Sequence, residues 1–140
     1  MLRLASFPDT VVLDVALSET FLRTATGSME GANWAVENGA DNVALHQSAI
    51  AIESLLKSYL LRTVTDDNWN RTHIRHDLDK AARYAAKAGL TLPPDLQCVI
   101  SLLHPHFQRG GFQRDVARRW PGGFAADVGE VVTALAKLVA

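Results

Sequence analysis

The segment Asp41–Arg62, DNVALHQSAIAIESLLKSYLLR, carries the strongest helical pattern in the chain. Its apolar residues recur at alternating steps of four and three positions, which places them on one face of a helix. These residues are Leu45, Ala49, Ile52, Leu56 and Tyr59. Asp41 or Asn42 would cap the start, whereas a start nearer Asn33 would place Gly39 in the interior at a cost of about 1 kcal/mol. We therefore expect a long amphipathic helix with one face in the core.

Four further stretches show helical periodicity, and punctuating residues separate them. The expected helices cover about residues 9–26, 41–62, 76–88, 94–107 and 123–139. Gly27 and Gly89 are expected to end the first and third of these helices, and Pro105 is expected to kink or end the fourth. Residues 63–75 are rich in Thr, Asp and Asn, so we expect a loop there.

Composition indicates an ordinary globular chain. The 140 residues include 14 Lys and Arg against 15 Asp and Glu, a formal charge of −1. These proportions exclude disordered and low-complexity classes, and the length suits one domain over residues 1–140. No strand pair and no internal repeat stands out, so the sequence predicts an all-α fold. Its expected form is an up-and-down antiparallel bundle of about five helices.

The single cysteine and the N-terminus bear on the compartment. Cys98 has no second cysteine to pair with, which favours a reducing environment, and the N-terminal residues do not resemble a signal peptide. No apolar stretch is long enough to span a membrane. We therefore expect a cytoplasmic protein with no membrane partner. Cys98 lies in an apolar segment beside Val99, so we expect a buried and inert thiol.

Motifs for metal, phosphate-loop or nucleophile chemistry are missing. His73 and His76 are three residues apart, but His73 falls in the expected loop. His104 and His106 are two apart, so a helix would not present them on one face. There is no HExxH motif and no second cysteine, and the Gly doublets do not complete a phosphate-binding loop. We expect neither a metal site nor a cofactor.

A second stripe runs beside the apolar one on the long helix. It consists of His46, Ile50, Glu53, Lys57 and Leu60. Glu53 and Lys57 have the favourable i,i+4 order, and two interpretations are open. They could form an exposed ion pair worth about 0.3–0.5 kcal/mol, or a polar seam that faces a pocket or a partner subunit. His76 could point across to this helix, while helix capping alone would explain Asp77.

Arginines and aromatic residues are concentrated between residues 109 and 120. The cluster consists of Arg109, Arg114, Arg118 and Arg119, with Phe112 and Trp120 interleaved. Arginine pairs with phosphate and aromatic rings stack on bases, so the cluster would suit a nucleotide or single-stranded RNA. The alternative is a solvated loop whose Arg stems cover apolar surface.

The order of these features resembles that of HEPN domains (higher eukaryotes and prokaryotes nucleotide-binding). The features are ALHQSAIAIESLLKSYLL, His76-Asp77-Leu78, GLTLPPDL and Arg119-Trp120-Pro121, with Trp in place of the Tyr of many members. The resemblance covers about residues 41–121. Glu53 and Lys57 match the Glu and Lys of the family's long helix.

This resemblance implies an up-and-down α-bundle that is commonly a homodimer. Some members are metal-independent ribonucleases with an Arg and a His four to six residues apart, late in the fold. Arg71 and His76 have that spacing, but they flank the start of the third expected helix, so we interpret the match as a coincidence. Other members bind nucleotides or accompany nucleotidyltransferase-like proteins.

The first hypothesis is a non-catalytic HEPN-like homodimer that binds a nucleotide, RNA or a protein such as a nucleotidyltransferase-like partner. The expected ligand-binding residues are Lys57, Glu53, His76, Asp77, Arg114 and Arg119. One alternative is a toxin-like, metal-independent ribonuclease that uses Arg71 with His73 or His76 as catalytic residues. Another is a purely structural interaction module.

Overall fold

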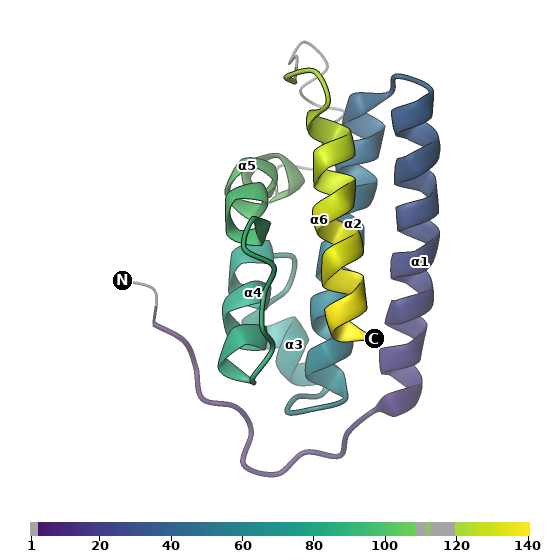
Figure 1. Ribbon diagram of the computed structural model, residues 1–140. Helices are drawn as coiled ribbons and strands as arrows, with labels where there is room; N and C mark the ends of the chain where they lie inside the picture. Colours follow the sequence, from purple (N-terminus) through teal and green to yellow (C-terminus); the bar gives the residue numbers. More distant parts are fainter. Residues whose placement is uncertain (1–2, 109–111, 113–119) are drawn as a thin grey trace.

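The protein is described by a computed structural model that covers residues 3–108, 112 and 120–140 (Figure 1). This part of the chain is helical and contains no strand, which confirms the expected all-α class. Its helices are α1 (Val15–Glu37), α2 (Asp41–Leu61), α3 (Asp67–His73), α4 (Leu78–Lys87), α5 (Leu96–Gln108) and α6 (Phe124–Val139).

Helix α2 is the centre of the domain. It contacts α1, α4, α5 and α6, and Figure 1 shows α1 on one side of it and the α4–α5 pair on the other. The expected apolar stripe is confirmed, because Leu45, Ala49, Ile52 and Leu56 are fully buried. Burial also extends to other faces of the helix, as at Ala51. A helix covered on several sides has such an all-round apolar surface.

Helices α1 and α2 form an antiparallel hairpin around small residues. Gly39 has a φ of 70°, a left-handed conformation that suits glycine in the short turn between the helices. At the open end of the hairpin the Ser18 hydroxyl donates to the Ser58 carbonyl, and the Ser58 hydroxyl donates to the Ser18 carbonyl, each at 2.8 Å. Because Ser18 and Ser58 both have short side chains, the two backbones lie close enough for these direct contacts.

The first helix differs from the expectation at both ends. It was expected over residues 9–26 but runs from Val15 to Glu37, and the side chain of Asp14 caps it by accepting a hydrogen bond from the Leu17 N–H at 2.9 Å. Gly27 lies inside the helix and does not end it. Because residues beyond Gly27 continue to pack on α2, tertiary contact outweighs the low helix propensity of one glycine.

A short helix lies where a loop was expected. The Asp66 side chain accepts a hydrogen bond from the Trp69 N–H at 2.8 Å and so starts α3, whose Trp69 is largely buried. Seven residues are too few to show a helical period in the sequence. The expected loop over residues 63–75 is therefore wrong in its centre.

Two expectations for α5 also need correction. Pro105 was expected to kink or end this helix; because it lies within α5, which continues to Gln108, the expectation that it ends the helix is wrong. Cys98 is exposed, not buried. The inward face of α5 carries Leu96, Ile100 and Leu103, and a residue two positions after Leu96 points away from that face.

The expectations for the remaining helices are close to the structure. The Asp77 side chain accepts a hydrogen bond from the Lys80 N–H at 2.9 Å and caps α4, as expected. Helix α6 begins directly after Gly123 and packs on α1, α2 and α5. None of the helices described has both the length and the apolar character that crossing a bilayer requires.

An extended N-terminal segment, residues 3–14, runs past the lower end of the bundle to α1 (Figure 1). The Ala5 N–H donates to the Tyr84 hydroxyl at 2.8 Å. The Phe7 ring centre lies 5.5 Å from that of Trp69 and 5.9 Å from that of Tyr84. This segment therefore ties α3 and α4 to the start of α1 through an aromatic cluster.

Candidate functional site

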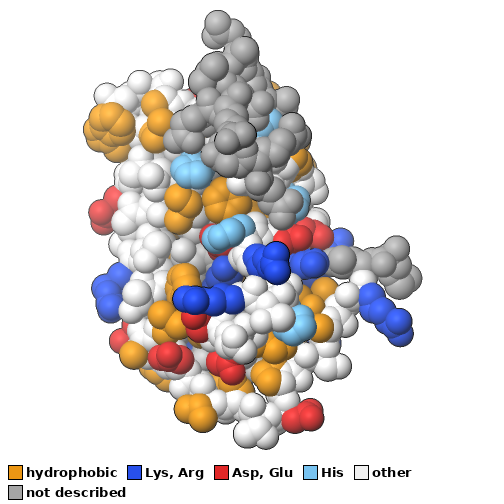
Figure 2. All heavy atoms as spheres, turned by 180° about the vertical axis from the view of Figure 1, so that it is seen from behind, with side chains coloured by type: hydrophobic (Ala, Val, Ile, Leu, Met, Phe, Trp, Pro, Cys, Tyr) orange, Lys and Arg blue, Asp and Glu red, His pale blue; other side chains and the backbone are white. Residues whose placement is uncertain are grey.

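A pocket of about 370 Å³ lies beside the C-terminal half of α2, where four elements supply its walls. Its lining residues are Phe21 of α1, Glu53 and Lys57 of α2, Asp67 and Arg71 of α3, and Arg75 and His76 from the turn before α4. Figure 2 shows basic, acidic and His side chains close together near the middle of the rear face. We refer to this pocket as the α3 pocket.

Glu53 and Lys57 form its inner wall. The Lys57 Nζ lies 3.0 Å from Glu53 Oε1, and the two side chains are only 11% and 12% exposed. The expected ion pair is thus confirmed, but its burial rules out the interpretation as an exposed surface pair. The pair instead forms a polar seam that lines a pocket.

Lys57 also fixes the turn that follows α3. Its ammonium group donates to the carbonyl oxygen of Arg75, while the Arg75 N–H donates to the Asn70 carbonyl at 3.0 Å. Arg75 has a φ of 55°, which is unfavourable for a residue with a side chain. The hydrogen bond from Lys57 helps to hold this conformation, because the carbonyl has a strong, charged donor.

His76 completes a three-residue cluster. Its Nδ1 lies 2.7 Å from Glu53 Oε1, the same oxygen that Lys57 contacts, so His76 does point across to the long helix. The His76 side chain is 77% exposed. With Nδ1 directed at the carboxylate, Nε2 is the ring atom left for solvent or a ligand.

The outer wall is basic. Arg71 Nε lies 2.9 Å from Asp67 Oδ2, and the Arg71 side chain is 79% exposed, which leaves most of its guanidinium in water. Arg75 is exposed as well. Lys57, Arg71 and Arg75 carry three positive charges against the two carboxylates, so the lining is net positive before His76 is counted.

The structure does not bring all of the expected site residues together. Lys57, Glu53 and His76 meet in the α3 pocket with Arg71, but Asp77 does not line it. The Asp77 carboxylate instead caps α4 and lies 3.8 Å from His104 Nε2. Arg114 and Arg119 lie outside the described residues.

Sequence reasoning missed Arg75, Phe21 and Asp67 as parts of the pocket. The available signal was the basic run Arg71-Thr-His-Ile-Arg75-His76, whose two arginines are four residues apart. That signal was not used because the run was assigned to a loop. Its first three residues in fact end α3, and the turn after them carries Arg75 and His76 into the pocket.

His46 lies on the same helix but in different surroundings. Its ring packs against Phe107 and Phe112, with ring centres 5.8 and 6.1 Å away. Burial lowers the pKa of His46, and its Nδ1 has no hydrogen-bond partner among the described residues. Burial therefore disfavours the charged form of His46, and His46 does not line the α3 pocket.

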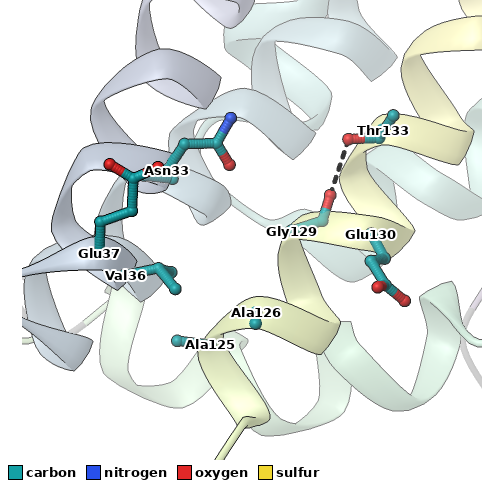
Figure 3. A pocket seen from close by; sticks show the side chains of 9 residues that line it. Asn33, Val36, Glu37, Ala125, Ala126, Gly129, Glu130 and Thr133 are labelled. Carbon is teal, nitrogen blue, oxygen red and sulfur yellow. Dashed lines mark hydrogen bonds between the residues drawn. The ribbon is translucent and has the colours of Figure 1, made fainter. Parts of the chain in front are cut away.

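Two grooves beside α6 differ from the α3 pocket in their charge. One, of about 380 Å³, lies between α1 and α6, and Figure 3 shows the small residues Ala125, Ala126 and Gly129 along its α6 side. Among the described residues, its charged lining residues are Glu37 and Glu130. The other lies between α5 and α6, and the described charged residues that line it are acidic as well. Among these three sites only the α3 pocket combines groups of both signs.

Comparison with known proteins gives no match to a family model, a curated protein or a solved structure. Within the part of the chain that the structure describes, no three His, Cys, Asp or Glu side chains gather as a metal site would require. The function is therefore inferred from the side chains that line the pocket.

Proposed function

We propose that this protein is a non-catalytic, HEPN-like antiparallel helical bundle that binds a nucleotide or RNA through phosphate at the α3 pocket. The observation that carries the proposal is the convergence of Lys57, Arg71, Arg75 and His76 from separate elements on one recess. A recess with cationic groups on several sides attracts an anion more strongly than scattered surface charges do.

The two walls of the pocket would have separate tasks. Glu53 holds Lys57 and His76 in place on the inner wall, so these groups orient the ligand without rearrangement. Arg71 and Arg75 have exposed side chains on the outer wall and can approach a phosphate in the planar, two-pronged manner of guanidinium groups. Phe21 provides an apolar surface in the same pocket for the rest of a nucleotide.

Binding of labelled single-stranded RNA and of ATP, followed by fluorescence anisotropy, tests the proposal. The variant Arg71→Ala/Arg75→Ala removes two exposed guanidinium groups and should preserve the fold. Because each hydrogen bond to a charged group contributes about 1.5–3 kcal/mol, affinity should fall at least about tenfold.

Arg23→Ala/Arg83→Ala is the matched control, since both arginines are exposed and neither lines the pocket. It produces the same change in net charge, so a general electrostatic effect would weaken binding equally in both variants. Equal affinities of the pocket variant and wild-type protein would rule out phosphate binding at the α3 pocket.

The HEPN resemblance also supports a homodimer and a protein partner of the nucleotidyltransferase-like kind. Light scattering on the full chain tests the first part, and a mass of one chain at micromolar concentration would exclude a stable homodimer. Arg114 and Arg119 stay predicted ligand contacts, which Arg114→Ala/Arg119→Ala would examine in the same binding assay.

A metal-independent ribonuclease is the second candidate, because Arg71 and His76 line the same pocket. Glu53 would orient the His76 imidazole, whose Nε2 could accept the proton of a ribose 2′-hydroxyl. The 2′-oxygen would attack the adjacent phosphate, the P–O5′ bond would break to leave a 2′,3′-cyclic phosphate, and the departing 5′-oxygen would take a proton from water. Arg71 would stabilise the extra negative charge on that phosphate.

RNA cleavage in EDTA by purified protein separates the two candidates. Cleavage that His76→Ala abolishes and His73→Ala preserves would favour the ribonuclease, because His73 does not line the pocket. Tight RNA binding without cleavage would favour the binding function.

A further inference from the structure

The groove between α5 and α6 has the shape and the lining of a docking surface. It has a volume of about 510 Å³ and is bounded by the segment before α5, by α5 itself and by α6. Val99, Leu102, Phe124 and Val131 supply its apolar surface. The Leu102 side chain stays exposed, with 42% of the residue surface accessible. In Figure 1, α5 and α6 lie on the viewer's side of α2.

The charged residues that line the groove, among those that the structure describes, are all acidic. They are Asp95, Asp127 and Glu130, and no described Lys, Arg or His lines it. All three are exposed, and within the described residues none of them forms an ion pair. Among the described residues no basic side chain offsets their charge, and an acidic edge of this kind attracts a cationic partner.

We infer that this groove binds a basic amphipathic helix of another protein, with apolar side chains against Leu102 and Val131 and with Lys or Arg beside Asp95, Asp127 and Glu130. Grooves between two helices commonly receive a third helix through residues spaced three and four apart. The groove shares no residue with the α3 pocket, so it is independent of the function proposed for that pocket.

Charge argues against a second copy of this chain as the symmetric occupant. In a two-fold contact the same surface meets itself, so the acidic edge of one groove would face the acidic edge of the other. Like charges placed together across an interface oppose association. A basic helix instead complements the three carboxylates while it covers the exposed Leu102.

Cys98 gives a direct readout, because it is the only cysteine in the sequence, is exposed and lines the groove. The probe is a synthetic helical peptide of about 18 residues with Leu on one face and Lys on the other. We expect this peptide to slow alkylation of Cys98 by N-ethylmaleimide severalfold. The same peptide with Glu in place of Lys should not slow it.

Two pairs of variants test the charge and the apolar contact separately. Asp127→Lys/Glu130→Lys should weaken peptide binding by about tenfold, whereas Glu19→Lys/Glu30→Lys changes exposed acidic residues of α1 by the same net charge and should have little effect. Leu102→Ser should also weaken binding by about tenfold, and Leu138→Ser, at a similarly exposed position outside the groove, should not.

Several outcomes would overturn the inference. They are no protection of Cys98 by the Leu/Lys peptide, equal protection by the Glu peptide, equal losses in both charge-reversal variants, and protection that rises with protein concentration alone. The last result would indicate a second copy as the occupant. Circular dichroism shows whether each variant retains its helical content.

Discussion

The α3 pocket and the groove between α5 and α6 have volumes of about 370 and 510 Å³. They differ in whether their charged side chains form ion pairs. In the pocket, Glu53 Oε1 contacts both Lys57 Nζ and His76 Nδ1. At the groove, Asp127 and its acidic neighbours have no ion-pair partner among the described residues. Buried, paired charges like those of the pocket are expected to matter for stability, whereas exposed, unpaired charges like those of the groove are expected to matter little for it.

Removing Glu53 should therefore have the largest effect on stability. Glu53→Leu leaves the Lys57 ammonium mostly buried, with the Arg75 carbonyl as its remaining partner. An uncompensated buried charge is strongly unfavourable, so we expect a loss of about 3 kcal/mol in the free energy of unfolding. Urea denaturation measures this loss.

A double variant tests whether the cause is the unpaired charge. Glu53→Leu/Lys57→Met replaces both charges with apolar groups and should be more stable than Glu53→Leu alone. Glu19→Leu, at an exposed position, should change stability by no more than about 0.5 kcal/mol. Strict additivity of the two single changes at Glu53 and Lys57 would contradict the coupling.

Removing a buried hydrogen bond between uncharged groups should have an intermediate effect on stability. Ser58→Ala removes the hydroxyl that donates to the Ser18 carbonyl between α1 and α2. We expect a loss of about 1 kcal/mol in the free energy of unfolding, the usual net contribution of such a hydrogen bond. Ser101→Ala is the control, because that exposed hydroxyl bonds within its own helix. Equal effects of the two changes would show that burial is not decisive.

Acidification should weaken the fold through His46. Burial lowers its pKa below 6.5, so the unfolded chain takes up a proton at a higher pH than the folded chain. This contribution to stability is complete above about pH 6.5 and is lost as the pH falls toward the lowered pKa. Thermal unfolding between about pH 7.5 and 5.5 should show the loss, and His46→Leu should show less of it.

Asp79 changes its protonation at lower pH than His46, so it does not affect stability in the pH range of the thermal unfolding experiment. Burial alone would raise the pKa of Asp79, but hydrogen bonds from Gln97 and Arg83 and the charges of Arg83 and His104 lower it. The contribution of Asp79 to stability is present above pH 3.8 and is lost as the pH falls through the lowered pKa.

An unchanged pH dependence of thermal unfolding in His46→Leu would show that His46 is not the responsible group.

The smallest change in stability is expected in the groove. Leu102→Ser alters an exposed side chain, so the free energy of unfolding should change by no more than about 0.5 kcal/mol. Urea denaturation of the isolated protein measures it. A loss above about 1 kcal/mol would mean that the groove supports the fold itself, and its distinction from the α3 pocket would fail.

The sequence predicted the helices whose signals are local and complete. For α2 the regular apolar spacing located the helix to within one residue, and for α4 the Asp77 cap marked the start. Helix α1 was misplaced because Gly27 is a stop signal only when nothing packs beyond it, and here the following residues pack on α2. Such a contact joins distant segments and leaves no local pattern.

The site was predictable in part for the same reason. Glu53 and Lys57 are four residues apart on one helix, so their pairing could be inferred. Their burial could not, because it depends on the turn at Arg75 and on α3, neither of which has a sequence period. The link from Glu53 to His76 spans 23 residues and was inferred only from the position of His76 beside a helix cap.

The central position of α2 has a consequence for how the α3 pocket responds to a ligand. Amide hydrogens on a helix enclosed by four others exchange with solvent only when much of the domain opens, so the wall that carries Glu53 and Lys57 should be among the slowest to take up deuterium. Arg71 and Arg75 lie on a seven-residue helix and its following turn, where exchange should be fast. A bound anion should therefore slow deuterium uptake mainly over residues 67–77 and leave α2 unchanged.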